Sequence, residues 1–286
     1  MGTLIKVGGV WKDAATHVKV GGVWKAAAPY VKVSGVWKPL GQRLWVPTDA
    51  GSDLIAWFDF TDAPPNTGGV LTHTGVIANK KGSGPTLTIE NGNSALSYAN
   101  SGVSIANGDG GFVRFTTDLP SVYFDMAFVG TANGPGSWRT LVVRDGGSFH
   151  HVILQDGGTA LGTYTNGFFT TGLAWAGGAL KQLYFTFRAD TDVQMALDGG
   201  TLSAATGEDY SGGGPTLVRP ALMNYTGGGQ GFGNHNEFVF MVAGQTTNLV
   251  KAQGYLAHKW DAELGVTTLV DNLPSGHAHK SSPPMV

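Results

Sequence analysis

The 286-residue chain contains no cysteine, which excludes disulfide bonds and thiolate metal ligands. It carries few charges, with 20 acidic residues against 18 lysines and arginines and a net charge of −2. So balanced a charge gives no electrostatic reason to expect nucleic-acid binding. No apolar run approaches the roughly 20 residues that span a bilayer, so we expect no membrane insertion. The opening "MGTLIKVGGV" lacks a basic segment followed by a long apolar stretch, so we expect no classical signal peptide.

Glycine is abundant, with 45 residues, and Thr, Ser, Asn and aromatic residues accompany it. Between residues 54 and 243, short segments of alternating side chains are separated by Gly, Asn, Asp and Pro clusters, without intervening helical segments. Many short strands joined by turns are typical of an antiparallel β-sandwich or jelly roll. The pattern therefore predicts an all-β fold.

One segment near the C-terminus has helical spacing. Residues 246–265 carry apolar side chains three or four positions apart, at Leu249, Ala252, Leu256 and Trp260. We expect Thr247 to cap the start of this helix and Gly265 to end it. Glycine weakens a helix by roughly 1 kcal/mol, so we expect Gly254 to allow close packing on the sheet. Leu256 and Trp260 are expected to be buried against the sandwich.

The first 38 residues contain three nearly identical octapeptides at a spacing of 13: "IKVGGVWK", "VKVGGVWK" and "VKVSGVWK". Each places Gly-Gly or Ser-Gly between runs rich in Val and Trp, which predicts a hairpin with a two-residue primed turn. A lysine then faces a tryptophan across each ribbon. The candidate attachment residues are these cation–π pairs, Lys6 with Trp11, Lys19 with Trp24, and Lys32 with Trp37.

Isolated hairpins are marginal in water, so the array is expected to need a partner surface. That surface is the following domain, a copy of the same chain, or another protein, and a small structural meander is the alternative. Proline and glycine punctuate the segment that follows the repeats. We therefore expect hairpin repeats over residues 1–38, a linker over 39–52, and a sandwich over 53–286.

The C-terminal stretches "KAQGYLAHKW" and "LPSGHAHKSSPP" resemble the signature of laminin-G-like, concanavalin-A-like jelly-roll domains of bacterial surface proteins and marine phage proteins. "LIAWFDF" resembles the first strand of that family. The resemblance covers about residues 53–284. It implies a concanavalin A-like (laminin-G-like) antiparallel jelly-roll sandwich with one short C-terminal helix and a wrapping tail. The chain departs from the family at "HAH" (277–279), where relatives usually have "HPY".

The N-terminal repeats resemble those on tail, spike and fibre proteins of tailed phages and gene transfer agents. A protein made in a bacterial cytoplasm and released by lysis needs neither a signal peptide nor disulfides. The resemblance therefore implies a virion spike or fibre protein whose partners are other virion proteins and a host surface glycan. A homo-oligomer is also compatible with three equivalent repeats.

Sugar binding requires an aromatic face and a few planar hydrogen-bonding groups. Two loops, at 131–140 and 224–236, offer this mixture. The residues expected to bind carbohydrate are Asn133, Trp138, Arg139, Asn224, Tyr225, Gln230, Asn234, His235 and Asn236. The alternative is that these segments are ordinary polar turns with a core tryptophan.

Jelly rolls of this type include glycoside hydrolases, and a retaining glycosidase needs two carboxyls about 5–5.5 Å apart. The four glutamates, at 90, 208, 237 and 263, lie in no E-x-D-x-x-E arrangement. We therefore expect no enzyme, and a polysaccharide depolymerase or a ligand-free decoration protein are the alternatives.

Histidines and glycine-rich segments give no clear cofactor site. Adjacent His150 and His151 point to opposite faces of a strand, so they cannot share a metal. No Lys-Ser/Thr follows the glycine-rich stretches at 211–215 and 227–233, which excludes a phosphate loop. No cofactor is expected. Calcium stays open because such sandwiches often hold it with oxygen ligands, although no ligand residues are assigned.

Overall fold

The computed structural model describes residues 3–7, 10–14, 17–26, 30–33, 36–39, 43–90, 96–99, 101–106, 108, 110–144, 149–207, 219–225 and 229–286. The chain forms two compact units. One comprises Met1–Trp45 with Pro284–Val286, and the other comprises Val46–Pro283.

The first unit contains three separate antiparallel hairpins, as predicted. They pair β1 (Thr3–Val7) with β2 (Val10–Ala14), β3 (His17–Val20) with β4 (Val23–Ala26), and β5 (Tyr30–Val33) with β6 (Val36–Pro39). The register places each repeat's lysine opposite its tryptophan. Gly21 and Gly22 have φ of 59° and 82°, which is the primed turn that favours glycine. The other two turns and the Lys–Trp side chains lie outside the described residues, so the cation–π pairs stay a prediction.

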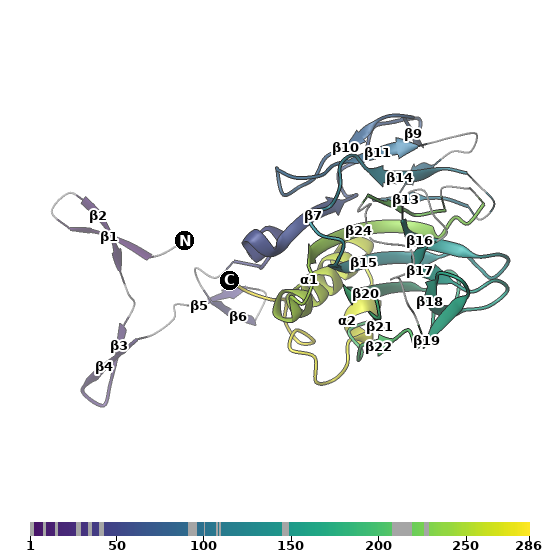
Figure 1. Ribbon diagram of the computed structural model, residues 1–286. Helices are drawn as coiled ribbons and strands as arrows, with labels where there is room; N and C mark the ends of the chain where they lie inside the picture. The colour runs from purple at the N-terminus through teal and green to yellow at the C-terminus, as the bar shows by residue number, and fades with distance from the viewer. Residues whose placement is uncertain are drawn as a thin grey trace. The chain divides into compact units, whose positions relative to one another are not determined.

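The second unit is a sandwich of two antiparallel sheets (Figure 1). The eight-stranded sheet contains, in spatial order, β10 (Val76–Ile77), β11 (Leu87–Glu90), β14 (Phe112–Phe115), β23 (Pro220–Leu222), β16 (Arg139–Arg144), β17 (His150–Leu154), β18 (Ala160–Tyr164) and β19 (Phe168–Ala174).

The ten-stranded sheet contains β22 (Ser203–Ala204), β21 (Asp192–Leu197), β20 (Leu180–Ala189), β15 (Phe124–Ala132), β24 (Gly233–Val242), β13 (Gly102–Ser104), β12 (Ser97–Ala99), β9 (Val70–Leu71) and β8 (Asn66–Thr67), with β7 (Leu54–Asp59) also paired to β24. Strands distant in sequence, such as β15 and β24, are neighbours, as in a jelly roll. The predicted all-β sandwich is confirmed.

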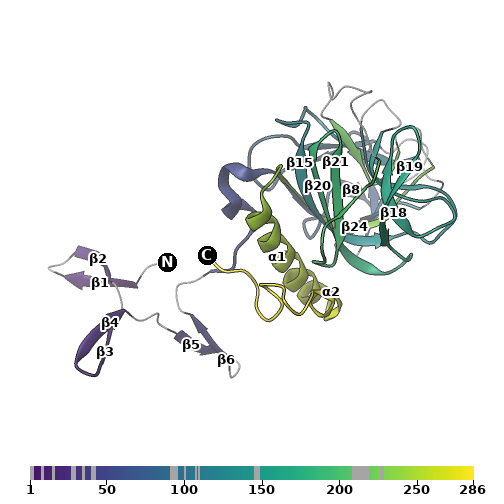
Figure 2. The ribbon, with the colours of Figure 1, turned by 60° about the horizontal axis from the view of Figure 1, so that its bottom comes forward.

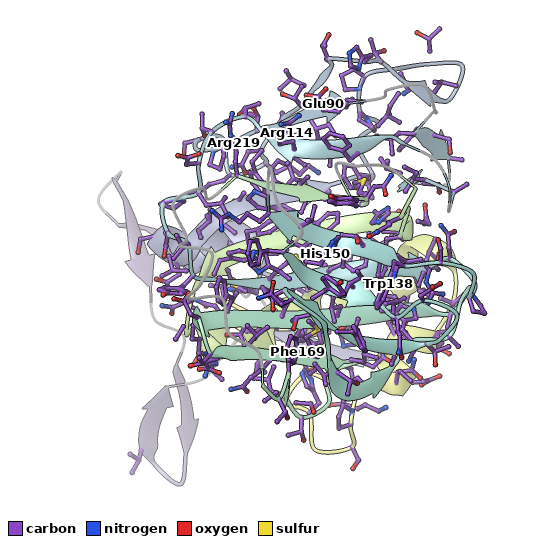
Figure 3. All side chains as sticks on the ribbon, turned by 45° about the vertical axis from the view of Figure 1, so that its right-hand side comes forward. Glu90, Arg114, Trp138, His150, Phe169 and Arg219 are labelled. Atoms are coloured by element: carbon purple, nitrogen blue, oxygen red, sulfur yellow. The ribbon has the colours of Figure 1, made fainter. Side chains whose placement is uncertain are left out.

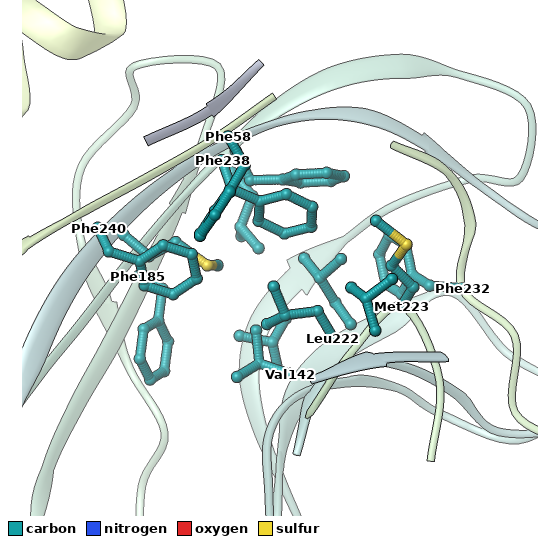
Figure 4. Close-up of a cluster of buried hydrophobic side chains, with 14 of the residues drawn as sticks. Phe58, Val142, Phe185, Leu222, Met223, Phe232, Phe238 and Phe240 are labelled. Carbon is teal, nitrogen blue, oxygen red and sulfur yellow. The ribbon is translucent and has the colours of Figure 1, made fainter. Parts of the chain in front are cut away.

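The core fills the space between the two sheets (Figure 4). Phe58, Phe185 and Phe240 come from the ten-stranded sheet, and Val142 and Leu222 come from the eight-stranded sheet. All five side chains are fully buried. Alternating side chains of each strand supply this core, so the intervening residues point outward.

The predicted helix is present as α1 (Thr246–Leu264), which a five-residue α2 (Thr268–Asn272) follows. It lies on the outer side of the ten-stranded sheet, away from the eight-stranded sheet (Figure 2). Leu256 and Trp260 are fully buried, and the left-handed Gly265 ends the helix, as expected. The start differs, because the cap residue is Gln245 and no side chain caps it. No helix of the described segments is long and apolar enough to cross a membrane.

Gly254 packs against the C-terminal tail, and this corrects the expectation that it packs on the sheet. A Cβ atom at Gly254 would overlap the Cβ atom and imidazole ring of His279. The tail is also tied to α1 by hydrogen bonds, from His258 Nε2 to the His279 carbonyl (2.8 Å) and between His277 Nε2 and Gln253 Oε1 (2.9 Å). The "HAH" departure from the family pattern is therefore a packing contact.

A buried charged network joins α1 to the sheet. Glu237 on β24 accepts hydrogen bonds from Trp57 Nε1 (2.6 Å), Trp260 Nε1 (2.7 Å) and Lys259 Nζ (2.6 Å). Lys259 Nζ also lies 2.7 Å from Asp59 Oδ2. Glu237 is fully buried, and burial raises its pKa although Lys259 opposes the rise. The "HKW" segment of the helix thus supplies one cation and one indole donor to two carboxylates.

Candidate functional site

The outer face of the eight-stranded sheet contains a cavity of about 190 Å³, which we call the aromatic pocket. Two of its residues, Trp138 and His150, are seen on this face in Figure 3. The lining consists of Trp138, His150, Ile153, Tyr164, Tyr225 and Gln230. These residues come from β17, from the end of β18, and from segments that precede β16 or follow β23.

A β-bulge in β17 places two pocket residues on the same face. His150 pairs with Tyr164 and Ile153 pairs with Gly162, so two residues of β17 oppose one residue of β18. A bulge of this kind shifts the alternation of side chains by one position. His150 and Ile153 therefore both face the pocket, whereas His151 packs in the core with its ring 5.1 Å from that of Phe187.

The aromatic rings of the pocket contact one another. The ring centroid of Trp138 lies 5.5 Å from that of Tyr164, and His150 lies 5.8 Å from Tyr164 and 5.1 Å from Tyr225. These separations are typical of edge-to-face and tilted aromatic pairs. Trp138 also lies 5.5 Å from Phe168. The rings support one another, and Trp138, Tyr164 and Tyr225 remain partly exposed.

A short hydrogen-bond chain sets the protonation of His150. Thr140 Oγ1 donates to Gln230 Oε1 (2.6 Å), and it also lies 2.8 Å from His150 Nδ1. Since a hydroxyl has one hydrogen, Thr140 must accept from Nδ1–H. Burial lowers the pKa of His150 to about 4, so the ring is neutral at pH 7. The proton on Nδ1 leaves Nε2 as the acceptor atom of the ring.

The pocket combines the groups that recognise a small polyhydroxylated ring. Three aromatic side chains offer apolar faces, and His150 offers an acceptor. Gln230 and two tyrosine hydroxyls offer both donors and acceptors. The volume lies below the roughly 300–1,000 Å³ of pockets for drug-sized ligands, so a single ring fits better than a longer molecule.

Three of the nine residues expected to bind carbohydrate line the aromatic pocket. They are Trp138, Tyr225 and Gln230, and the two predicted loops that carry them do meet. The other six do not line it, and their side chains make internal hydrogen bonds.

Three of these six residues fix the loops around the pocket. Asn224 is fully buried, and its Oδ1 accepts from the backbone N–H groups of Tyr225 and Gln230, both at 2.8 Å. Arg139 is fully buried and donates to the carbonyls of Asn133, Gln155 and Gly158. Asn133 Nδ2 donates to two further carbonyls. Asn224 is therefore a positioning residue for the pocket.

Asn234, His235 and Asn236 lie on β24, and this corrects their assignment to a binding loop. His235 is fully buried and stacks on Phe238, with a centroid separation of 6.0 Å. Burial lowers its pKa to about 3. Asn234 hydrogen-bonds with Ser104, and Asn236 hydrogen-bonds with the Ser101 carbonyl. His235, which is fully buried, therefore cannot contact a surface ligand, whereas Asn234 is partly exposed.

The pocket also contains residues that were not expected to bind carbohydrate. His150 and Tyr164 form a cross-strand pair, and Ile153 joins them through the bulge. The sequence feature that could have indicated them is a His at the start of one alternating segment (150–154) and a Tyr at the end of the next (160–164). Across the described ranges, no group of three or more His, Asp or Glu residues could hold a metal ion.

The chain was compared with known families, curated proteins and solved structures. No protein-family model and no curated protein sequence matches it. Two similar solved structures are Trypanosoma rangeli sialidase with 2,3-difluorosialic acid and the same sialidase with sialic acid. Their TM-scores are both 0.50, at 12% and 13% identity. They cover 69% and 78% of this chain but 32% and 34% of the sialidase, so the chain spans about a third of the sialidase's length.

A third similar structure is domain 4 of AbnA, a GH43 extracellular arabinanase from Geobacillus stearothermophilus, in complex with arabinotriose. It has a TM-score of 0.48 at 16% identity and covers 69% of this chain and 98% of that domain.

The expectation that the chain is not an enzyme is contradicted by these comparisons. The sialidase whose structures share its sandwich is an enzyme. At 12–13% identity the likeness shows the fold alone. The absence of a glutamate motif therefore does not exclude catalysis.

Proposed function

We propose that the sandwich binds a carbohydrate and that the aromatic pocket holds one sugar ring of it. The observation that carries this proposal is the pocket itself, in which Trp138, Tyr164 and Tyr225 surround polar groups of His150 and Gln230. The apolar face of a pyranose stacks on aromatic rings, and its hydroxyls pair with such groups. A sialidase solved with sialic acid has the same fold, which supports a sugar as the class of ligand.

The test is binding of the full chain to an array of oligosaccharides, followed by titration calorimetry. Trp138→Ala should lower the affinity at least about tenfold, which corresponds to about 1.4 kcal/mol. Tyr225→Phe should weaken binding by removing one hydroxyl. Tyr123→Phe makes the same chemical change outside the pocket and is the matched control. Unchanged affinity in the first two variants, with unchanged melting temperatures, would place the site elsewhere.

Release of reducing ends should be measured on the same glycans. Sialidases share this sandwich, so binding and hydrolysis are separate questions for this chain. A variant that loses binding and product release together would assign both to the aromatic pocket.

We also propose that the chain is a virion spike or fibre protein, made in a bacterial cytoplasm and released by lysis. The glycan would then belong to the host surface, and the repeats would attach the sandwich to other virion proteins or to copies of this chain. The support is the triplicate hairpin array, whose equivalent registers offer equivalent contacts. It also includes the resemblance of these repeats to those of phage appendages.

Deleting residues 1–38 tests the attachment role. The shortened chain should stay soluble and bind the same glycans but should no longer join particles that lack the full-length protein. Normal incorporation would show that the repeats are not the anchor. An insoluble product would mean that the repeats complete the sandwich.

A further inference from the structure

A second pocket lies on the same outer face as the aromatic pocket. This arginine pocket has a volume of about 310 Å³ and is lined by Thr88, Glu90, Arg114, Phe115, Thr116 and Arg219. Figure 3 shows Glu90, Arg114 and Arg219 at one end of the face that also carries His150 and Trp138.

One row of cross-strand neighbours connects the two pockets. Arg114 on β14 pairs with Ala221 on β23, Ala221 with Val143 on β16, Val143 with His150 on β17, and His150 with Tyr164 on β18. Three strand spacings of about 4.8 Å separate β14 from β17, which is roughly 14 Å. That distance exceeds one sugar ring, so only an oligosaccharide is long enough to reach both pockets, and Ala221 and Val143 between them are fully buried.

The arginine pocket is built to accept negative charge. Two guanidinium groups and one carboxylate line it. The Arg114–Glu90 ion pair measures 3.4 Å and the Arg219–Asp118 pair 3.8 Å. Charge-assisted pairs usually measure about 2.7–2.9 Å, so both of these ion pairs are longer than usual. Arg219 Nε, the atom that faces Asp118 Oδ1 in its ion pair, is buried and makes no hydrogen bond among the described residues.

We infer that the arginine pocket binds the anionic group of an acidic sugar in the same glycan whose other ring occupies the aromatic pocket. This inference rests on the proposed function. Guanidinium groups match the planar, bidentate geometry of a carboxylate and also pair with sulfate. The ligand class is therefore an oligosaccharide with a uronate or sulfate group, and the threonine hydroxyls at 88 and 116 add neutral hydrogen bonds.

The experiment uses the full chain on an array of matched oligosaccharide pairs. Each uronate-containing glycan stands beside its carboxyl-reduced form, and each sulfated glycan beside its desulfated form. The readout is the ratio of acidic to neutral affinity within a pair. Arg114→Gln and Arg219→Gln should each lower this ratio roughly ten- to hundredfold. Arg188→Gln makes the same charge change on the other sheet and should leave the ratio as in the wild type.

Glu90→Gln should raise the acidic-to-neutral ratio, because it removes a carboxylate that repels the ligand. A role for this ion pair in folding alone does not produce opposite effects at its two partners. Equal binding of acidic and neutral partners by the wild type would overturn the inference but leave the carbohydrate proposal intact. An acidic-to-neutral affinity ratio that Arg114→Gln does not change would also overturn the inference and leave the carbohydrate proposal intact. Failure of the wild type to bind any glycan would overturn both.

Discussion

Replacing Lys259 with methionine should destabilise the sandwich far more than a surface ion pair would. Lys259 Nζ lies 2.6 Å from Glu237 Oε2 and 2.7 Å from Asp59 Oδ2. Without it, a fully buried carboxylate keeps only neutral donors, among them the indole N–H groups of Trp57 and Trp260. Breaking a buried pair in this way costs about 3–5 kcal/mol. For a domain of this size, that corresponds to a fall in melting temperature of roughly 6–20 °C.

Lys80→Met is the matched control. Lys80 Nζ pairs with Asp59 (2.8 Å) and with Asp62 (2.9 Å), and the Asp62 side chain is 76% exposed. Asp59 keeps Lys259 as a partner in this variant, so the cost should be about 1 kcal/mol or less. The double variant Lys259→Met with Glu237→Gln should recover much of the lost stability, because a neutral amide needs no cation.

The pH dependence gives an independent check on the same reasoning. Burial already raises the pKa of Glu237, and loss of Lys259 removes the group that opposes this rise. A carboxyl whose pKa is raised in the folded state lowers the protein's free energy of unfolding as the pH rises, because the folded state binds more protons than the unfolded state. The stability gap between Lys259→Met and the wild type should therefore narrow as the pH falls from 8 to 5. A melting temperature equal to that of Lys80→Met, or a gap that widens in acid, would refute the account.

Three further outcomes follow from packing and burial. Gly254→Ala should cost about 1–3 kcal/mol in chemical denaturation, because the new methyl group overlaps His279, and adding His279→Gly should restore stability. Asn224→Ala should weaken glycan binding without contacting the ligand, whereas Asn236→Ala should not. Burial lowers the folded-state pKa of His150 to about 4 and those of His151 and His235 to about 3, below the ordinary 6.5. The unfolded state therefore binds more protons, and the melting temperature should fall from pH 7 to pH 4. A melting temperature that does not change over this range would contradict the burial of these histidines.

Local alternation was enough to predict most long strands of the sandwich. Apolar residues two positions apart in "LTIE" and "FVRF" became the buried faces of β11 and β14. The turn at residues 198–199, where both residues have positive φ, falls on a "DG" dipeptide, which is typical of such turns. Strand order was not predictable from such patterns, because β23 inserts between β14 and β16 from about 80 residues away. The pocket depends on that order.

The expected end of one loop was wrong, and the cause is physical. The glycine-rich segment was expected to stay a loop to residue 236, but β24 begins at Gly233, which pairs with Ala132 on β15. That pairing directs His235 into the core, where its imidazole stacks on phenylalanine. Trp138 and Tyr225 were found because a large aromatic ring in a polar loop has few ways to be buried. His150 was not, because the bulge beside it cannot be recognised from alternation.

The two outer faces of the sandwich differ in what covers them, and this difference explains where the two pockets lie. Helix α1, with Lys259 and Trp260, covers the outer side of the ten-stranded sheet and neutralises the charges of Glu237 and Asp59. The outer side of the eight-stranded sheet carries instead the aromatic pocket and, three strands away, the arginine pocket. Tyr164, Tyr225 and Gln230 there are partly exposed, and exchange of water for a ligand costs less at such positions than in the core. A ligand that spans both pockets must therefore lie across the strands, so single-pocket variants should weaken long glycans more than short ones.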